Sequence, residues 1–199
     1  MSSEHRFPVL ALAILIIGVV VVASITIVFI FSPALAPSSS VISIPQAKQS
    51  ADQSIARISS NLRVAEIEEY TRNFYVRVQE NSTGINAFAL LVEKTTGAAT
   101  QELGPDMMWN TKYGMMGFGR APTANMPVTA DNATEYAQRW LDANIPGSKA
   151  EKPDTFYGYY TIDTSVNGST YGMLSVNGYS GEVWYHTWHG QFITSVEYS

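Results

Sequence analysis

Residues 173–185 read MLSVNGYSGEVWY, and residues 89–99 read ALLVEKTTGAA. Each stretch is a mostly apolar run, followed by a polar turn that contains glycine and by a return to small or apolar residues. This pattern predicts two β-strands joined by a tight turn in which Gly97 or Gly181 supplies a positive φ. Placing Gly97 on Gly181 superimposes the two stretches without a gap. The pairs that this alignment brings together are Leu90 with Leu174, Val92 with Val176, Thr96 with Ser180, and Ala99 with Val183. The sequence therefore predicts an internal repeat.

The residues before each turn follow the same order of elements. Residues 47–62 carry apolar side chains at helical spacing, and residues 64–70 and 73–80 then change to the alternation of strands. The helical stripe consists of Ala51, Ile55, Ile58 and Leu62. In the second half, residues 133–143 predict a helix with Asp131 as its N-cap, and the segments 156–166, 170–177 and 182–188 predict strands. The predicted fold class is α+β, with two units that each pack a helix on an antiparallel sheet.

A membrane segment precedes both units. Residues 9–31 read VLALAILIIGVVVVASITIVFIF and contain no charged side chain. At about 1.5 Å per residue, this length crosses a hydrocarbon core of about 30 Å as a helix. A cleaved signal peptide is the alternative, but its apolar region normally spans about 7–15 residues, and Pro37 directly follows the Ala34-Leu35-Ala36 sequence that resembles a cleavage site. We therefore expect a single transmembrane anchor.

Charge sets the expected orientation and excludes several classes of protein. Arg6 precedes the helix and the next basic residue is Lys48, which predicts a cytoplasmic N-terminus and an extracytoplasmic C-terminal part. The net charge of −5 disfavours nucleic acid as a partner. The chain has no cysteine, which excludes disulfides and thiolate sites. Sequons at Asn81, Asn132 and Asn167 are compatible with export.

The helix-and-strand units with their [TS]-G-[EA]-apolar turns, in ALLVEKTTGAA and MLSVNGYSGEVWY, resemble the PepSY family. In the first unit Ala98 stands where the second has Glu182. The resemblance implies a non-enzymatic regulator of peptidases or of other proteins near the cell surface, often anchored in the membrane. The predicted division of the chain is a cytoplasmic stub (1–8), a transmembrane helix (9–31), an extended tether (32–46), a first PepSY-like unit (47–100), a Met- and Gly-rich connecting segment (101–130) and a second PepSY-like unit (131–199).

Catalytic and metal-binding patterns are weak in this sequence. His186 and His189 are separated by an odd number of positions, which on a strand sends their side chains to opposite faces, so they are expected to share a metal ion only if residues 186–189 form a turn. Gly178-Tyr179-Ser180-Gly181 lacks the final glycine of a nucleophile elbow, because Glu182 stands there. Glu66 and Glu68 share a strand face that is expected to be solvated. No catalytic residue and no cofactor are predicted.

The connecting segment is rich in methionine. Met107, Met108, Met115 and Met116 offer soft thioether ligands that suit Cu(I), so a copper or other soft-metal binding protein is one alternative. The other interpretation is that these adaptable side chains fill a seam between the two units.

Aromatic residues of the last predicted strand suggest a binding surface. Trp184, His186 and Trp188 are expected on one face of that strand, as candidates for contact with a protein partner. Burial of the two sheets against each other is the alternative explanation for these aromatics. The expected function is that of a membrane-anchored, extracytoplasmic interaction module without enzymatic activity. Its expected partners are the lipid bilayer, through the N-terminal helix, and a peptidase or a membrane complex.

Overall fold

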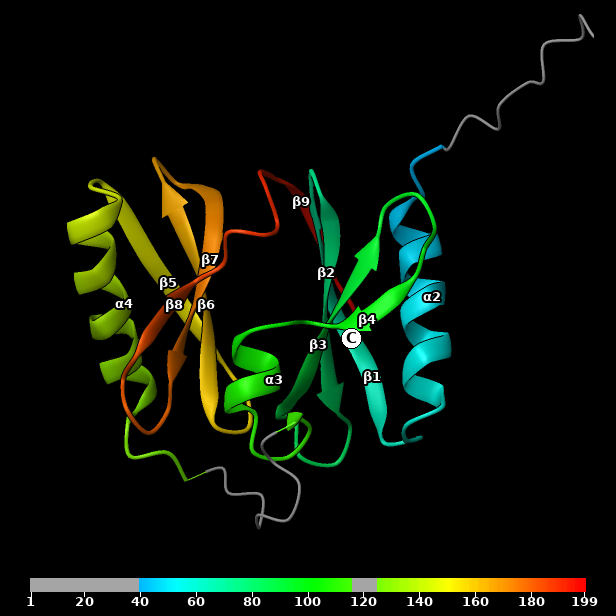
Figure 1. Cartoon of the computed structure of the whole chain (residues 1–199), viewed down its shortest axis with the longest axis horizontal. Coiled ribbons are helices and arrows are strands. Elements are labelled where there is room, and N and C mark those ends of the chain that lie inside the picture. The colour runs from blue at the N-terminus through cyan, green and yellow to red at the C-terminus, as the bar shows by residue number, and fades with distance from the viewer. Residues whose placement is uncertain (1–39, 116–124) are drawn as a thin grey trace, which may run out of the picture. The chain divides into compact units, whose positions relative to one another are not determined.

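The computed structural model describes residues 40–115 and 125–199, which form two antiparallel sheets with one long helix on the outer side of each (Figure 1). The predicted α+β class is confirmed. The first unit comprises α2 (Ile44–Ala56), β1 (Leu62–Tyr70), β2 (Asn73–Glu80), β3 (Asn86–Glu93) and β4 (Ala99–Gln101). The second unit comprises α4 (Ala130–Asn144), β5 (Ser148–Thr155), β6 (Tyr159–Val166), β7 (Ser169–Asn177) and β8 (Val183–Tyr185). The short helix α3 (Pro105–Trp109) lies between the units in sequence, and β9 (Phe192–Glu197) follows them.

The strand pairings confirm the predicted alignment of the two halves. Leu90 pairs with Gln101 in the first unit, and the residues aligned with them, Leu174 and Tyr185, pair in the second. The two glycines of the turns also match, because Gly97 has φ +71° and Gly181 has φ +74°. Each donates its backbone N–H at 2.9 Å to the carbonyl of the residue that ends the preceding strand. The two units therefore share the same order of elements and the same last hairpin.

Both long helices begin earlier than the apolar pattern predicts. Ser43 and Gln46 form a capping box, with the backbone N–H of Ser43 donating to Gln46 Oε1 at 2.8 Å, so α2 starts at Ile44 and takes up the end of the predicted tether 32–46. The helix ends at Ala56, and Leu62 opens β1 instead of closing the helix. In the second unit Thr129, not Asp131, caps α4 by accepting from Asn132 N at 3.2 Å.

Each unit has its own apolar core between its helix and its sheet. Ala47, Ala51 and Ile55 of α2 face the first sheet, and Ala133, Ala137 and Leu141 of α4 face the second. Small alanines on these faces let each helix approach its sheet closely. The inner face of each sheet, opposite its helix, packs against the other sheet. The two inner faces share a third buried cluster, which contains Tyr70, Tyr75, Ala89 and Met173. Figure 1 shows the sheets between the two outer helices.

The C-terminal strand crosses back to the first unit. The first sheet has the order β4-β3-β2-β1-β9 and the second β5-β6-β7-β8. The predicted second unit, 131–199, included residues that in fact pair with β1, as Val196 does with Ile67. An unpaired β1 would expose a row of backbone N–H and C=O groups, and β9 satisfies them. The segment 186–191 therefore connects the two sheets.

No helix within residues 40–115 and 125–199 has the length and apolar character needed to cross a bilayer. The predicted stub 1–8 and transmembrane helix 9–31 lie outside the described residues.

Candidate functional site

The interface between the two sheets is rich in polar side chains. The guanidinium of Arg77 on β2 contacts Glu66 of β1 at 2.6 Å and Asp154 of β5 at 2.7 Å, so it links the two units. Glu68, which was expected on a solvated face with Glu66, is 4% exposed, and burial raises its pKa well above the usual value. The expectation failed because the inner face of the first sheet packs on the second. Tyr70 Oη donates to Glu68 at 2.6 Å.

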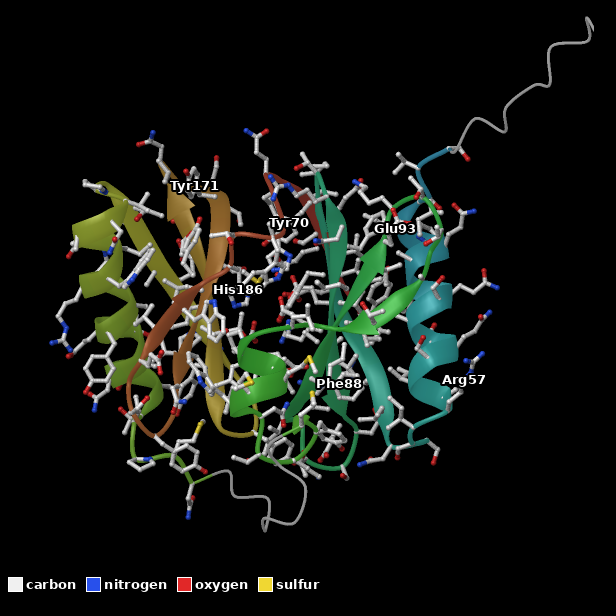
Figure 2. The ribbon with its side chains drawn as sticks, in the orientation of Figure 1. Arg57, Tyr70, Phe88, Glu93, Tyr171 and His186 are labelled. Atoms are coloured by element: carbon white, nitrogen blue, oxygen red, sulfur yellow. The ribbon has the colours of Figure 1, made fainter. Side chains whose placement is uncertain are left out.

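The most distinctive group in this interface consists of Glu102, His186 and His189. Glu102 directly follows β4, and its backbone N–H donates to Ala89 O at 2.9 Å. His186 directly follows β8, and its N–H donates to Met173 O at 3.0 Å. The alignment that places Gly97 on Gly181 also places Glu102 on His186, so these are equivalent positions of the repeat. The duplicated architecture thus brings one residue from each unit to the same place, and Figure 2 shows His186 between the sheets.

The three side chains approach one another through single atoms. Glu102 Oε1 lies 3.4 Å from His186 Nδ1 and 3.1 Å from His189 Nε2. The two ring nitrogens are 3.2 Å apart. His189 reaches this point because the chain leaves the strand after Tyr185, so residues 186–189 do not alternate. The strand geometry that would send the two histidines to opposite faces is therefore absent from residues 186–189. The chain instead bends at residues 188–189, as shared ligation was expected to require.

Each imidazole also forms a hydrogen bond through the ring nitrogen that does not face Glu102. His189 Nδ1 lies 2.9 Å from Asn73 Oδ1, and the amide nitrogen of Asn73 donates to Trp188 O at 3.1 Å. That second bond orients the amide, so Oδ1 accepts from His189 Nδ1–H. His186 Nε2 lies 3.0 Å from Ser175 Oγ.

Aromatic rings enclose the cluster. The ring of Trp188 stacks on His186 with centroids 4.5 Å apart, and its Nε1 donates to Glu102 Oε1 at 3.0 Å. Tyr70 stacks on His189 at 4.8 Å, and Tyr75 meets the same imidazole edge-on at 5.5 Å. Such surroundings exclude water and strengthen the electrostatic interactions among the three groups.

The electrostatics of the cluster reflect this burial. Burial by itself raises the pKa of Glu102, but the charge and hydrogen bonds of His186 and His189 outweigh it and lower the pKa to about 2. Burial lowers the pKa of His189, against the opposing effect of the carboxylate. Glu102 Oε2 is buried and has no hydrogen-bond partner among the described residues. A carboxylate in this position needs a cation beside it.

A second buried carboxylate lies close by in sequence. Asp106 of α3 is fully buried and accepts from Tyr159 Oη at 2.7 Å, Asn110 Nδ2 at 3.0 Å and Gln101 Nε2 at 2.8 Å. Burial raises its pKa to about 7 despite these donors. Because Tyr159 belongs to β6, this group connects α3 to the second sheet.

The predicted methionine ligands that the structure describes differ in their exposure. Met107 is half-buried, while Met108 is 51% and Met115 65% exposed. Met116 lies outside the described residues. The segment 105–113 does lie against the second unit. Its contacts are both polar, such as Thr111 N to Tyr157 O at 2.9 Å, and aromatic, such as Tyr113 with Tyr157. Copper binding by the methionines stays a prediction.

The predicted partner-binding residues lie near one another but differ in exposure. Trp184 is 38% exposed, Trp188 is half-buried, and His186 is 4% exposed. The expectation of one shared face is wrong for His186, because strand β8 ends at Tyr185 and the histidine turns inward. The exposed indole of Trp184 is not isolated, since Trp109 of α3 meets it edge-on with centroids 5.7 Å apart.

Two further exposed apolar residues come from the chain around α3. Leu103 is 66% exposed and Met108 is 51% exposed. Gly104 brings this chain against Trp184 and Trp188, because a Cβ built on it would lie 3.3 Å from the indole of Trp188 and 3.5 Å from that of Trp184. We call Leu103, Met108, Trp109 and Trp184 the aromatic patch.

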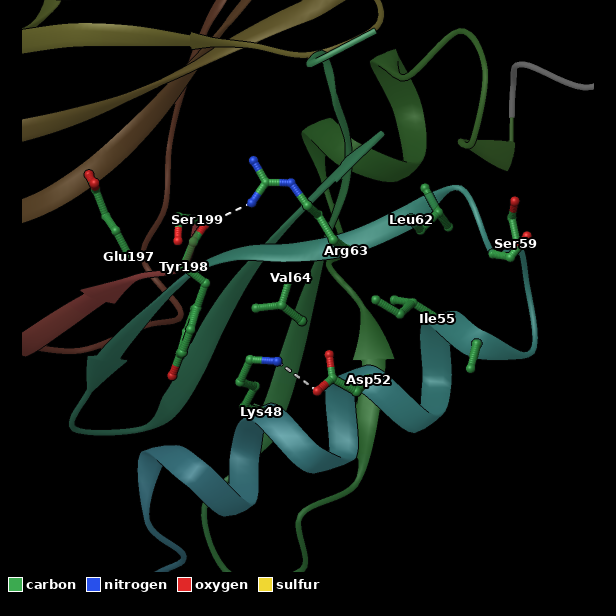
Figure 3. Close-up of a pocket in the computed structure, with 12 residues that line it drawn as sticks. Lys48, Asp52, Ile55, Ser59, Leu62, Arg63, Val64, Glu197, Tyr198 and Ser199 are labelled. Atoms are coloured by element: carbon green, nitrogen blue, oxygen red, sulfur yellow. Dashed lines mark hydrogen bonds and ion pairs between the residues drawn. The ribbon is translucent and has the colours of Figure 1, made fainter. Parts of the chain in front are cut away.

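A cleft of about 500 Å³ lies elsewhere, between α2, β1 and the residues after β9 (Figure 3). Three of its charged groups already have partners, as Lys48 contacts Asp52 at 2.7 Å and Arg63 donates to Tyr198 O at 2.8 Å. These pairs leave the cleft a weaker candidate than the interface between the sheets.

Sequence reasoning missed Glu102 altogether. Nothing near it in sequence marks it as a ligand or a base. The internal repeat was the available signal, because the alignment of Gly97 with Gly181 also aligns Glu102 with His186.

The fold and this interface define a duplicated α+β domain with a buried polar cluster at the junction of its two copies. The chain is structurally similar to the C-terminal domain of YpeB from Bacillus megaterium, at 10% sequence identity and a TM-score of 0.27. The match covers 72% of this chain and 62% of that domain. No protein-family model matches the chain, and no curated protein matches its sequence. Membership of the PepSY family therefore stays a prediction.

Proposed function

We propose that this protein is a membrane-anchored, extracytoplasmic interaction module of PepSY type that has no enzymatic activity. It binds a protein partner in or near the membrane, either a peptidase that it modulates or a membrane complex that it joins as an accessory subunit. The observation that carries the proposal is the aromatic patch, in which Leu103 is 66% and Trp184 38% exposed.

The composition of the patch suits protein recognition. Tryptophan and methionine are enriched in the centres of protein interfaces, where large apolar side chains fill pockets on the partner. Trp184 rests against Trp109, and Gly104 lies beneath it, so its ring is already ordered before binding. An ordered anchor loses less conformational entropy when a partner binds.

The predicted anchor would keep the domain close to the bilayer. Only the segment 32–39 separates the end of the apolar run at Phe31 from Ser40, the first described residue. A segment of this length spans at most about 30 Å, at about 3.3–3.6 Å per residue. A domain tethered within that distance meets membrane proteins and proteins at the membrane surface.

The buried cluster supports a non-enzymatic role. The three facing atoms of Glu102, His186 and His189 are covered by Trp188 and Tyr70. A catalytic group has to come within hydrogen-bond reach of its substrate. In this fold that would require the two sheets to separate.

The test is co-purification of a partner from detergent-solubilised membranes of the native host. Trp184→Ser with Leu103→Ser should remove the partner that the parent protein retains, while circular dichroism remains unchanged. Ile58→Ser is the matched control, because Ile58 is 56% exposed but lies in the connection from α2 to β1 and not in the patch. Equal retention by the patch variant and the parent would show that the patch is not the binding surface.

A further inference from the structure

We propose that Glu102, His186 and His189 bind one divalent transition-metal ion, with Zn²⁺ as the expected ion. The ligand atoms are Glu102 Oε1, His186 Nδ1 and His189 Nε2. The site is independent of the proposed partner and of the methionines, and it lies at the junction of the two units.

The spacing of the three atoms fits a single ion. They lie 3.4, 3.1 and 3.2 Å from one another. Zinc binds imidazole nitrogen and carboxylate oxygen at about 2.0–2.2 Å, and two such ligands at a tetrahedral angle are about 3.4 Å apart. One ion placed beside this triangle therefore contacts all three atoms with small adjustments of the side chains.

The supporting hydrogen bonds orient the imidazoles for ligation. His189 donates Nδ1–H to Asn73 Oδ1, which leaves the lone pair of Nε2 directed at the other two groups. His186 Nε2 has Ser175 Oγ at 3.0 Å, so the serine can accept its proton and leave the Nδ1 lone pair free. Histidine ligands in metalloproteins usually bond a second residue in this way through the nitrogen that does not bind the metal.

When both histidines are neutral, their protons satisfy this arrangement poorly. If His186 Nδ1 carries a proton, it donates to its two neighbours, but His189 Nε2 and Glu102 Oε1 still face each other as two acceptors 3.1 Å apart. Glu102 Oε2 has no partner among the described residues, although the side chain is fully buried. A divalent cation attracts all three lone pairs together and compensates the buried carboxylate.

The donor set narrows the choice of metal. Two imidazoles and one carboxylate suit zinc and ferrous iron, whereas Ca²⁺ and Mg²⁺ prefer all-oxygen sites and Cu(I) prefers thioethers and thiolates. The rings of Trp188 and Tyr70 enclose the ligand atoms, and the fourth position of a tetrahedral zinc ion falls to Glu102 Oε2 or to a water molecule. Because Glu102 follows β4 and His186 follows β8, the ion joins the two sheets.

The test uses the full-length protein in detergent, stripped with a chelator and dialysed against Zn²⁺. The expected result is one zinc per chain with micromolar or tighter affinity, and a rise in the thermal midpoint on loading, because the ion binds the folded state. Glu102→Gln and His189→Gln should each abolish stoichiometric binding. Asp106→Asn, a change at another buried carboxyl, should keep it, as should His5→Ala.

A measurement on the parent protein decides the matter if the ligand variants do not fold. The chain has three histidines, His5, His186 and His189. On titration with Zn²⁺, the ring nitrogen resonances of His186 and His189 should shift together to saturation at one equivalent, while those of His5 stay in place. A parent protein that takes up no zinc, or that binds it without a shift of these two rings, would overturn the proposal, and so would full binding by both folded ligand variants.

Discussion

Asp106 should make the stability of the domain depend on pH in a specific window. Burial raises the pKa of its carboxyl from 3.8 to about 7 in the folded protein. The folded state therefore holds this proton more tightly than the unfolded chain does. The stabilisation is complete below about pH 3.8 and is lost as the pH rises through about 7.

The size of the effect follows from the shift. Each pH unit within the window changes the free energy of unfolding by about 1.4 kcal/mol per proton, so Asp106 contributes a loss of about 2–3 kcal/mol between pH 5 and pH 8. Burial is the largest effect and raises the pKa of the carboxyl. Hydrogen bonds from Tyr159, Gln101 and Asn110 lower it in part, and the nearby Glu102 carboxylate raises it further. In Asp106→Asn this contribution is absent.

The assay is guanidinium unfolding of parent and variant at pH 5, 6, 7 and 8, with a chelator present and circular dichroism as the signal. Asp106→Asn should be less stable than the parent by a margin that shrinks by about 2–3 kcal/mol from pH 5 to pH 8. Glu93→Gln is the control, because hydrogen bonds from Thr96 and Thr95 lower the pKa of Glu93 to about 2 and confine its effect to more acidic solutions. Parallel profiles for the parent and Asp106→Asn would refute the reasoning.

The remaining predictions concern the repeat and the anchor. Gly97→Val and Gly181→Val should each destabilise the domain by about 1 kcal/mol or more, because both positions have positive φ. The loss of stability should be larger at Gly181, because a Cβ there would lie 2.7 Å from the ring of Tyr136, whereas a Cβ at Gly97 would lie 3.2 Å from Ser50 Oγ. Equal losses in chemical denaturation would contradict this order. The full-length protein should stay in the membrane fraction after an alkaline carbonate wash, and external protease should digest its C-terminal domain. Recovery of a soluble chain that begins near Pro37 would instead indicate a cleaved signal peptide.

The repeat could be predicted from sequence because it depends on local chemistry. A glycine with positive φ between two apolar runs marks a hairpin wherever it occurs, and Gly97 and Gly181 mark it twice. The first residues of the helices were harder to predict from the sequence. Ser43 and Gln46 precede the apolar stripe, so an assignment from periodicity alone begins the helix too late.

The repeat aligns Glu102 with His186, but the contacts within the buried cluster could not be predicted, because they depend on how the two sheets meet. Glu102 and His186 belong to different units, far apart in sequence, and each lies just beyond the end of a strand. Local spacing says nothing about a contact that forms across two copies of a unit. The same packing buries Glu68, which alternation had assigned to solvent. The position of β9 in the first sheet is also a tertiary effect, since an edge strand accepts any suitable segment that reaches it.

The most direct test of the central proposal is photo-crosslinking from the aromatic patch in living cells. A benzophenone amino acid replaces Trp184 in one strain and Ile58 in another, both exposed positions on different units. We expect a discrete adduct with an exported or membrane protein from position 184 and none from position 58. An adduct of twice the chain's own mass would indicate self-association instead. No adduct from position 184, or identical adducts from both positions, would contradict the proposal that this patch binds a specific protein partner.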